Sequence, residues 1–198
     1  MILSDKQILS YKDADAPFNI WMGAISSGKT HISIKKLIER LQNGPKGDVL
    51  ITGVSRTTIQ HNVLSLLYPA LGFPMPSPKA MQTRLYGKDV YFKGVHDSGA
   101  VKDIQGCTLA LAYCDEVVNM PQNVWNMLIG RLRVPGAQLF ATCNPEGPSH
   151  WFKKDIIDIP LTSNESLKSN SCMFKLTPAP TVPVLIKNVL KISCIFSC

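Results

Sequence analysis

Residues 18–30 decide the fold, and they read Phe18-Asn19-Ile20-Trp21-Met22-Gly23-Ala24-Ile25-Ser26-Ser27-Gly28-Lys29-Thr30. The last eight of them fit the pattern G-x-x-x-x-G-K-[ST] at every required position, which is the phosphate-binding P-loop. The apolar run before this loop has the length of a buried strand. After it, from Ile34 to Leu41, apolar residues recur at the i, i+3, i+4, i+7 spacing of an amphipathic helix. Because a P-loop joins a strand to a helix, this context favours a nucleotide-binding loop over a chance match in a Gly/Ser-rich turn.

Each position of the loop has a physical role. Gly23 and Gly28 allow backbone conformations that are closed to other residues, so the N–H groups of the loop can converge on phosphate oxygens at the start of a helix. In this motif Lys29 contacts the β- and γ-phosphates, and the Thr30 hydroxyl ligates Mg²⁺. The sequence therefore predicts ATP and Mg²⁺ as cofactors. The candidate nucleotide-binding residues of the loop are Gly23, Ala24, Ile25, Ser26, Ser27, Gly28, Lys29 and Thr30.

A second motif lies at residues 109–116, which read Leu109-Ala110-Leu111-Ala112-Tyr113-Cys114-Asp115-Glu116. A continuous apolar run is typical of a central parallel strand, because both faces of such a strand are covered. Asp115 is the candidate metal ligand beside Thr30, and Glu116 is the candidate base that takes a proton from the attacking water. The alternative is a pair of exposed acids that open a turn, which the P-loop upstream disfavours.

Other polar residues are candidates that also have ordinary explanations. Gln7 either reads the adenine edge, since its amide offers a donor and an acceptor, or is a solvated surface residue. Arg56 follows an apolar run, at the sheet edge where ligands bind in open α/β sheets, and either faces phosphate or is a surface arginine. Arg131 and Arg133 act as an arginine finger, contact DNA or simply end a helix in solvent. Asn144 follows another apolar run, where its amide can hold the attacking water or sense the γ-phosphate.

The remaining stretches complete an α/β pattern. Ser55 can cap a helix over residues 57–67, in which every fourth residue from Ile59 to Leu67 turns inward. The four prolines of residues 69–78 predict an irregular connection after it. The other predicted elements are a strand at 48–54, a hairpin at 83–95, a short helix or loop at 97–106, a helix at 121–132 and a strand at 138–145.

Composition narrows the class further. A chain of 198 residues predicts one α/β domain with a sizeable core. The net charge of +7 suggests a polyanionic partner, of which nucleic acid is the usual one. Polar residues interrupt the N-terminus early and apolar runs stay far below the ~20 residues that span a bilayer, so we expect neither a signal peptide nor a membrane segment. Six cysteines without a C-x-x-C pair predict neither zinc nor disulfides, and a reduced cytoplasmic setting fits.

The sequence resembles one family, the large subunit of the tailed-phage terminase, through three stretches that follow one another in the chain: residues 23–30, 109–116 and 141–151. The third stretch, Ala141-Thr142-Cys143-Asn144-Pro145-Glu146-Gly147-Pro148-Ser149-His150-Trp151, looks like the family's coupling motif and its following His-Trp, which generic P-loop enzymes lack. The resemblance covers roughly residues 1–158. It implies a P-loop ATPase domain of the α/β class, with a mostly parallel central sheet flanked by helices.

The resemblance also implies roles and partners. It places Lys29 and Thr30 on phosphate and metal, Asp115 on Mg²⁺, Glu116 as catalytic base, Asn144 as coupling residue and Gln7 on adenine. ATP hydrolysis would drive double-stranded DNA into a procapsid in the host bacterial cytoplasm, away from any membrane. The implied partners are the terminase small subunit, the portal protein and further copies of the chain in a ring. Many members carry an arginine within the loop, where this chain has Ser26, so Arg56, Arg131 and Arg133 are considered for the transition state.

Residues 159–198 differ in character from the rest. They contain no glycine, a single acid and three cysteines, and residues 177–183 are rich in proline. We assign neither a strand nor chemistry to this tail, and divide the chain into an ATPase domain at 1–158 and an atypical tail at 159–198 that suggests truncation or a frameshift. The family continues into a nuclease domain, so we expect no nuclease activity here. The alternatives are an inert or binding-only P-loop fragment, or another helicase-like P-loop ATPase.

Overall fold

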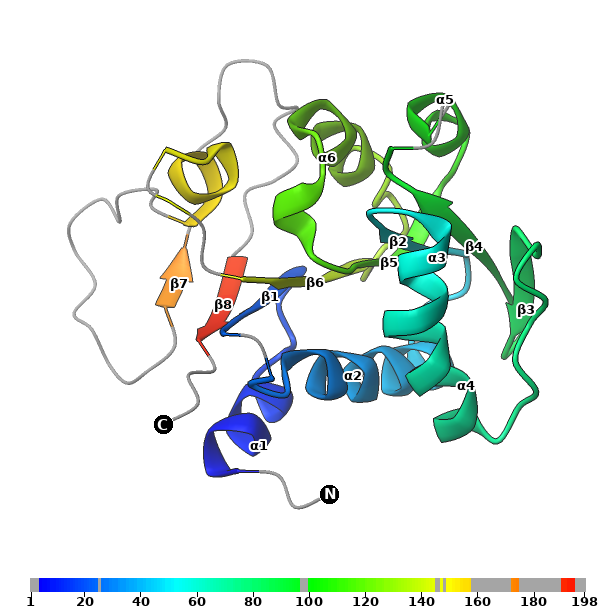
Figure 1. The fold of residues 1–198 in the computed structure, drawn as a ribbon, viewed down its shortest axis with the longest axis horizontal. Coiled ribbons are helices and arrows are strands. Elements are labelled where there is room, and N and C mark those ends of the chain that lie inside the picture. The colour runs from blue at the N-terminus through cyan, green and yellow to red at the C-terminus, as the bar shows by residue number, and fades with distance from the viewer. Residues whose placement is uncertain are drawn as a thin grey trace.

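The computed structural model describes residues 4–24, 26–96, 100–144, 147, 149–157, 172–174 and 190–194. The described strands form an eight-stranded sheet in the order β3-β4-β2-β5-β6-β1-β8-β7 (Figure 1). They are β1 (Phe18–Met22), β2 (Asp48–Gly53), β3 (Gln82–Leu85), β4 (Lys88–Gly94), β5 (Leu109–Cys114), β6 (Gln138–Cys143), β7 (Cys172–Phe174) and β8 (Leu190–Cys194). Neighbouring strands are parallel except at the two ends, where β3 and β7 are antiparallel to their partners. The predicted mostly parallel α/β sheet is thus confirmed.

Helices cover both faces of this sheet. The described helices are α1 (Asp5–Lys12), α2 (Lys29–Asn43), α3 (Arg56–Thr58), the π-helix η1 (Ile59–Leu64), α4 (Ser65–Leu71), α5 (Ala100–Gln105), the 3₁₀-helix η2 (Val117–Asn119), α6 (Gln122–Ile129) and the π-helix η3 (Lys153–Ile157). Helices α1, α2 and α4 lie on one face, and α5 and α6 lie on the other (Figure 1). Within the described residues, no helix combines the length and apolar character needed to cross a membrane.

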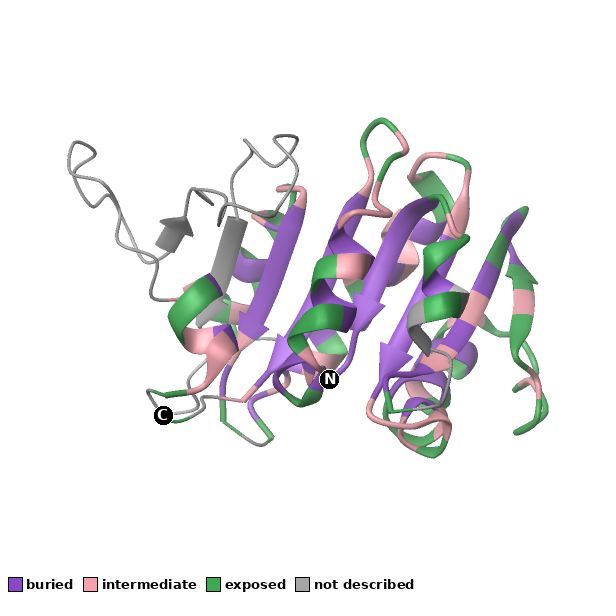
Figure 2. Ribbon diagram, turned by 90° about the horizontal axis from the view of Figure 1, so that it is seen from above, coloured by how far each residue is buried: buried purple, intermediate pink, exposed green. Residues whose placement is uncertain are grey.

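The core is split by the sheet into two layers, and β5 contributes to both. All six residues of β5 are buried, and successive side chains of a strand point to opposite faces. Leu111 and Tyr113 pack with the apolar residues of α2 and α4, whereas Ala112 and Cys114 pack with those of α6. Figure 2 shows that buried residues concentrate in the central strands. Burial on both faces explains why this strand reads as a continuous apolar run.

The helix after β2 begins as predicted. Ser55 is its N-cap: the Thr58 N–H donates to Ser55 Oγ (3.2 Å), and the Ser55 N–H donates to Thr58 Oγ1 (2.9 Å). These reciprocal bonds satisfy two N–H groups that the first turn leaves without helical partners. The helical segment then runs through α3, η1 and α4, and Ile59, Val63 and Leu67 are buried, as their spacing predicts.

Its end differs from the prediction. The segment continues to Leu71 and therefore passes Pro69, although the four prolines of residues 69–78 predict an irregular connection there. Pro69 cannot donate a backbone hydrogen bond, but Leu67 and Tyr68 bury their side chains in the core, and this packing keeps the turn helical. The helix ends at Gly72, which takes the left-handed conformation (φ 70°) that terminates many helices.

The hairpin and the next two helices follow the prediction with shifted bounds. Leu85 pairs with Lys88, so the loop is Tyr86-Gly87, and both residues have positive φ, as in a type I′ turn. Helix α5 falls within residues 97–106, of which 97–99 lie outside the described residues. Helix α6 is shorter than the predicted 121–132, because the Arg131 carbonyl leaves the helix to accept the Leu109 N–H (2.8 Å) at the start of β5.

Two short strands of the tail belong to the same sheet, and our assignment of no strand there was wrong. Residues Leu190–Cys194 form β8, which pairs in parallel with β1 from Phe18 to Met22. Residues Cys172–Phe174 form β7 at the outer edge. The period-2 alternation of β8, with lysine and serine between apolar residues, is a strand signal, but it is only five residues long. The division of the chain at residue 158 stays a prediction.

Candidate functional site

Three loops that follow parallel strands meet at one edge of the sheet. β1 leads into the P-loop, β5 into Asp115 and Glu116, and β6 into Asn144, and the sheet order places β6 between the other two. Carboxyl ends of parallel strands share one edge, where ligands bind in open α/β sheets. The described residues of the P-loop therefore converge with Asp115, Glu116 and Asn144 where the sequence predicted a nucleotide site.

Gly28 has the special backbone conformation that was expected of the loop glycines, whereas Gly23 is not among the residues with positive φ. Ser26 (φ 64°) and Gly28 (φ 80°) are both left-handed, and Ile25 lies outside the described residues. The left-handed conformation of Gly28 favours glycine, and a Cβ atom there would lie 2.4 Å from Nε2 of Gln7, so the end of that side chain would have to move aside. The loop opens directly into α2, whose positive dipole end favours an anion at this point.

Backbone hydrogen bonds close the loop and attach it to the sheet. The Ser27 N–H donates to the Ala24 carbonyl (3.2 Å), and the Gly23 N–H donates to the Cys143 carbonyl (3.3 Å) at the end of β6. The loop is therefore anchored beside the residue that precedes Asn144.

Lys29 and Asn144, which the sequence assigned to different motifs, are in direct contact. Lys29 Nζ donates to Asn144 Oδ1 at 2.6 Å and to the Ala24 carbonyl at 3.3 Å. The lysine is 8% exposed, so these oxygens replace much of the water that its ammonium would otherwise bind. A hydrogen bond from a charged donor is stronger than a neutral one, and it holds Lys29 at the mouth of the loop.

Asp115 is a buried carboxylate with a donor on each oxygen. It is 5% exposed. Its Oδ1 accepts from the Thr142 hydroxyl (2.9 Å), and its Oδ2 accepts from Asn62 Nδ2 (2.9 Å). Thr142 Oγ1 also accepts the Glu116 N–H (3.0 Å). One threonine of β6 therefore fixes the carboxylate of Asp115 and the backbone of Glu116 together.

Glu116 has a strained backbone and a half-buried side chain. Its φ of 50° is left-handed, which costs about 1–3 kcal/mol for a residue with a Cβ, and the hydrogen bond from its N–H to Thr142 helps to hold it there. Its Oε2 accepts from Asn119 Nδ2 (3.2 Å) in the turn that follows. Strain of this kind gathers at active sites, and an oriented carboxylate is suited to accept a proton.

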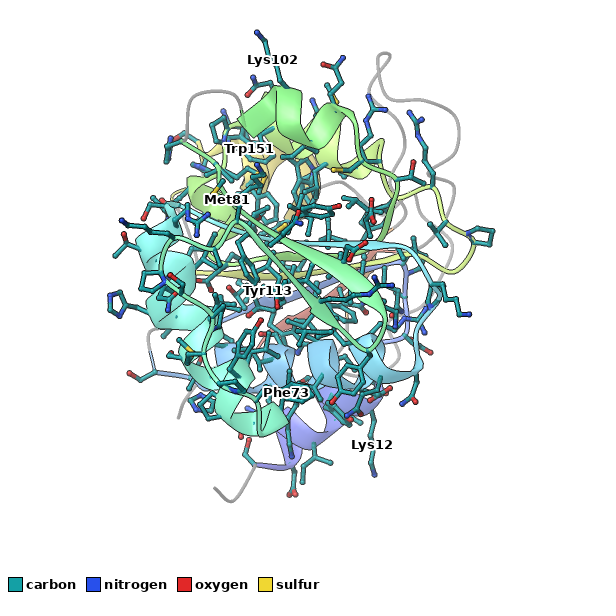
Figure 3. The ribbon with its side chains drawn as sticks, turned by 90° about the vertical axis from the view of Figure 1, so that its right-hand side faces the viewer. Lys12, Phe73, Met81, Lys102, Tyr113 and Trp151 are labelled. Carbon is teal, nitrogen blue, oxygen red and sulfur yellow. The ribbon has the colours of Figure 1, made fainter. Side chains whose placement is uncertain are left out.

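The strand that precedes Asp115 is tied to the helix that follows the P-loop. The hydroxyls of Tyr113 and Ser33 are hydrogen-bonded at 2.8 Å, and Ser33 Oγ donates to the Thr30 carbonyl (3.0 Å). Figure 3 shows Tyr113 inside the molecule. Burial, with a contribution from the charge of Asp115, raises the pKa of Tyr113 well above its usual range, and burial raises the pKa of Cys114 to about 12.

Gln7 reaches the P-loop, as its predicted role requires. Its Nε2 donates to the Ser27 carbonyl (3.0 Å), and its Oε1 accepts the Ser4 N–H (2.9 Å) in the capping box of α1. The amide thus uses a donor and an acceptor within the chain. The reading of adenine by Gln7 stays a prediction.

Arg56 contacts the connection that leads into β3. Its Nη2 donates to the Pro78 carbonyl (3.0 Å) and to the Ala80 carbonyl, and its Nη1 contacts Met81 Sδ. Met81 is labelled in Figure 3. Arg56 does follow the carboxyl end of β2, as predicted, but these contacts direct its guanidinium to residues 78–81. Its contact with phosphate stays a prediction.

Arg131 and Arg133 contact groups near their own position in the chain. Arg131 Nη2 lies 3.5 Å from Met127 Sδ, and Arg133 Nε donates to the Gly130 carbonyl (2.8 Å) at the end of α6. Arg131 is half-buried and Arg133 is exposed. The choice between an arginine finger, DNA contacts and a solvated helix end stays open.

The donor set fits a magnesium ion. Mg²⁺ prefers oxygen ligands and in nucleotide sites is held by one or two protein groups together with phosphates and water. Thr30, in the first turn of α2, supplies a hydroxyl, and the buried Asp115 supplies a carboxylate. No group of three or more His, Cys, Asp or Glu that could hold a metal ion occurs among the described residues.

Sequence reasoning missed three supporting residues. Thr142 belongs to the strand end that we singled out, but it received no role; a hydroxyl one strand away from a buried carboxylate was the available signal. Asn119 and Asn62 carry no local pattern. Asn62 lies 53 positions from its partner Asp115, and only the packing of the helical segment after β2 brings them together.

One protein family matches most of the chain. A family described as phage terminase large subunit matches residues 15–178. No curated protein matches the chain.

Solved structures of large terminases are also similar to this chain. The large terminase of a thermophilic bacteriophage is 29% identical, with a TM-score of 0.69 over 80% of this chain and 43% of that chain. The same terminase has been solved with ADP and with ATP-γ-S. The large terminase ATPase domain of Thermus phage P74-26, at 15% identity and a TM-score of 0.62, covers 98% of this chain and 80% of that one, a likeness of fold. The chain thus spans less than half the length of the first of these terminases.

Proposed function

The chain belongs to the family of phage terminase large subunits, and from this premise we propose that it is an ATP-hydrolysing motor domain. We propose further that hydrolysis, with Mg²⁺, drives double-stranded DNA into a procapsid. The nucleotide complexes of the 29% identical terminase support ATP as the ligand. The convergence of the P-loop, the two acids and Asn144 at one sheet edge supports hydrolysis as the reaction.

One observation carries the proposal: the hydrogen bond of 2.6 Å between Lys29 Nζ and Asn144 Oδ1. It joins the phosphate-binding lysine to the stretch that resembles the coupling motif. A phosphate oxygen is a charged acceptor and binds an ammonium more strongly than a neutral amide oxygen does, so a bound phosphate would draw Lys29 Nζ towards itself. Occupation of the loop would release Asn144 from Lys29, and departure of the phosphate would restore the contact. The end of β6 would thereby have two states that depend on the nucleotide.

The other residues divide binding from chemistry. Thr30 and Asp115 would hold Mg²⁺, which when bound neutralises charge on the phosphates. Glu116, fixed by Thr142 and Asn119, would orient the attacking water and take its proton. Gln7, at the Ser27 carbonyl, would contact the base of the nucleotide.

The transition state also calls for a cation. Arg56 is the candidate within the domain because it follows the sheet edge where the site lies, and it would have to leave the carbonyls of Pro78 and Ala80 to serve. Arg131 and Arg133 are the alternatives. A finger supplied in trans would come from a neighbouring copy in a ring.

The proposed partners follow from the family. Double-stranded DNA would be held through its phosphates, in keeping with the net charge of +7. The terminase small subunit, the portal protein and further copies of the chain would complete the motor in the host cytoplasm.

The test is ATP turnover by the purified chain with and without linear double-stranded DNA. We expect DNA to raise turnover, and Asn144→Ala to keep ATP binding but lose that increase. Asn123→Ala, a change of an exposed asparagine of α6, is the matched control and should behave as the unmodified chain. ATP binding with no turnover, with or without DNA and portal, would instead identify a binding-only fragment.

A further inference from the structure

Asn62 occupies an unusual place beside the metal end of the site. It lies on η1, a π-helix. Such helices are rare in proteins, and those that occur are often found at functional sites. Its side chain is exposed, yet Nδ2 donates at 2.9 Å to Oδ2 of Asp115, which is 5% exposed. An exposed amide that reaches a buried carboxylate stands at the boundary between that carboxylate and solvent.

The surrounding packing fixes this contact. Gly53, at the end of β2, lets the helical segment approach closely, because a Cβ there would lie 2.9 Å from Ile59 and 3.8 Å from the Cβ of Asp115. The cap at Ser55 sets where the segment begins, and the buried side chains of Ile59 and Val63 hold η1 against the sheet. Asn62 is therefore carried to Asp115 by a rigid element rather than by a loop.

From these contacts we propose that Asn62 is a positioning residue, which orients the Asp115 carboxylate for Mg²⁺ and so sets the metal affinity of the site. The inference rests on the proposed nucleotide site. Thr142 holds Oδ1 and Asn62 holds Oδ2, so the plane of the carboxylate is fixed from two sides. Each carboxylate oxygen still has a second lone pair for a metal or a metal-bound water.

Asn62 can be tested more cleanly than Thr142. Thr142 also accepts the Glu116 N–H, so its loss would disturb the catalytic base as well as the metal ligand. The described contact of the Asn62 side chain is with Asp115. A purely structural role for Asn62 would change nucleotide binding equally with and without metal, whereas a positioning role changes only the metal-dependent part.

The experiment follows binding of a fluorescent ADP analogue to the full chain, first in EDTA and then as Mg²⁺ is added. Loss of a residue that orients a metal ligand weakens metal affinity about 10–100-fold, so Asn62→Ala should need about tenfold more Mg²⁺ for half-maximal binding. Its affinity in EDTA should equal that of the unmodified chain. His61→Ala, on the same helix and also exposed, is the control and should leave the Mg²⁺ midpoint unchanged.

A second variant tests the geometry by another route. Asn62→Asp places a second carboxylate beside Asp115, where like charges repel. Without metal this variant should melt at a lower temperature than Asn62→Ala, and Mg²⁺ should raise its melting temperature more than that of the unmodified chain.

Equal Mg²⁺ midpoints for Asn62→Ala and the unmodified chain would overturn the positioning role. So would a melting temperature of Asn62→Asp that matches Asn62→Ala and does not respond to Mg²⁺. Failure of the unmodified chain to bind nucleotide at any Mg²⁺ concentration is a separate result and would overturn the proposed function itself.

Discussion

The phosphate end of the site and its metal end are built in different ways. At the phosphate end, residues 23–30 follow one another in the chain, and the loop is closed by its own backbone bonds and by left-handed Ser26 and Gly28. At the metal end, Asp115 depends on Thr142 and Asn62, which lie 27 and 53 positions away. The loop of the first end is encoded by consecutive residues, although Cys143 and Asn144 anchor it to β6, whereas the carboxylate of the second end is positioned by side chains that are distant in the sequence. We therefore expect changes at the phosphate end to act on binding, and changes at the metal end to act on metal and chemistry.

The largest effect that we expect is on the rate of hydrolysis, through a change at the metal end alone. Glu116→Gln keeps the shape of the side chain but removes the base, so hydrolysis should fall by about 10²–10⁴-fold. Binding of Mg-ATP should be largely kept, because the phosphate end is untouched. Turnover and nucleotide titration of the same preparation provide the two measurements. If Asp115→Asn and Glu116→Gln lose metal-dependent binding alike, the two acids do not have the separate roles assigned to them.

The next effect belongs to the phosphate end. Lys29→Ala removes a charge-assisted contact of about 1.5–3 kcal/mol, so ATP affinity should fall about tenfold or more. Asn144→Ala removes a hydrogen-bond acceptor of Lys29 Nζ and should not weaken binding, since the other N–H donors of the lysine can still reach phosphate. Calorimetric titration of both variants sharpens the comparison. Unchanged ATP affinity in a folded Lys29→Ala protein would rule out residues 23–30 as the phosphate loop.

A smaller effect tests how local the phosphate end is. Gly28→Ala puts a side chain at φ 80°, which costs about 1–2 kcal/mol, and adds the contact with Gln7 Nε2. Adding Gln7→Ala relieves the contact but not the conformation, so the double variant should recover only part of the stability. Denaturant unfolding of the unmodified chain, Gly28→Ala, Gln7→Ala and the double variant measures both terms, because Gln7→Ala alone loses the hydrogen bonds of Gln7 with Ser27 and Ser4. Full recovery would mean that crowding by α1, and not the loop backbone, requires glycine here.

Sequence predictability follows the same division. The strand at residues 18–22, the loop and the helix after it were readable because each is a local pattern. The position of Asn144 at the sheet edge of the P-loop followed from a topological rule, since strands with parallel neighbours bring their carboxyl ends to one edge, but its hydrogen bond with Lys29 was not predicted. Asn62 could not be found, because a single asparagine on a helix carries no pattern and its partner is distant in the chain.

The two errors in the predicted fold also arise from packing between residues that are distant in the sequence. The helix passes Pro69 because Leu67 and Tyr68 are buried, a tertiary effect that outweighs the local preference. β8 was missed because five alternating residues are a weak signal by themselves, and its pairing with β1 depends on residues far earlier in the chain. The local motifs were predictable from the sequence, whereas the side-chain packing at Pro69 and the pairing of β8 with β1 were not.

The smallest expected effect concerns the joint between the two ends. Tyr113, on the strand of the metal end, is hydrogen-bonded to Ser33 on the helix of the phosphate end. Tyr113→Phe removes this buried bond and should cost about 1 kcal/mol, or roughly 2–4 °C in melting temperature for a chain of this size. Tyr86→Phe, which removes an exposed phenol of the hairpin and its surface hydrogen bond from Gln42 Nε2 (3.0 Å), is the control for loss of a hydroxyl outside the core.

The loss of stability caused by Tyr113→Phe should become smaller as the pH rises. Because the pKa of Tyr113 is raised well above 10.0 in the folded protein, the unfolded chain loses the phenolic proton above about pH 10 while the folded chain keeps it. The stability that comes from this group is thus fully present below pH 10 and is lost as the pH rises towards the folded pKa. Phenylalanine has no proton to lose. Tyr11 and Cys114, whose pKa values are raised to about 12, titrate in both proteins and cancel in the difference. The gap in melting temperature between the unmodified chain and Tyr113→Phe should therefore narrow as the pH is raised from about 9 to about 11, and a constant gap would mean that Tyr113 is not buried at the joint.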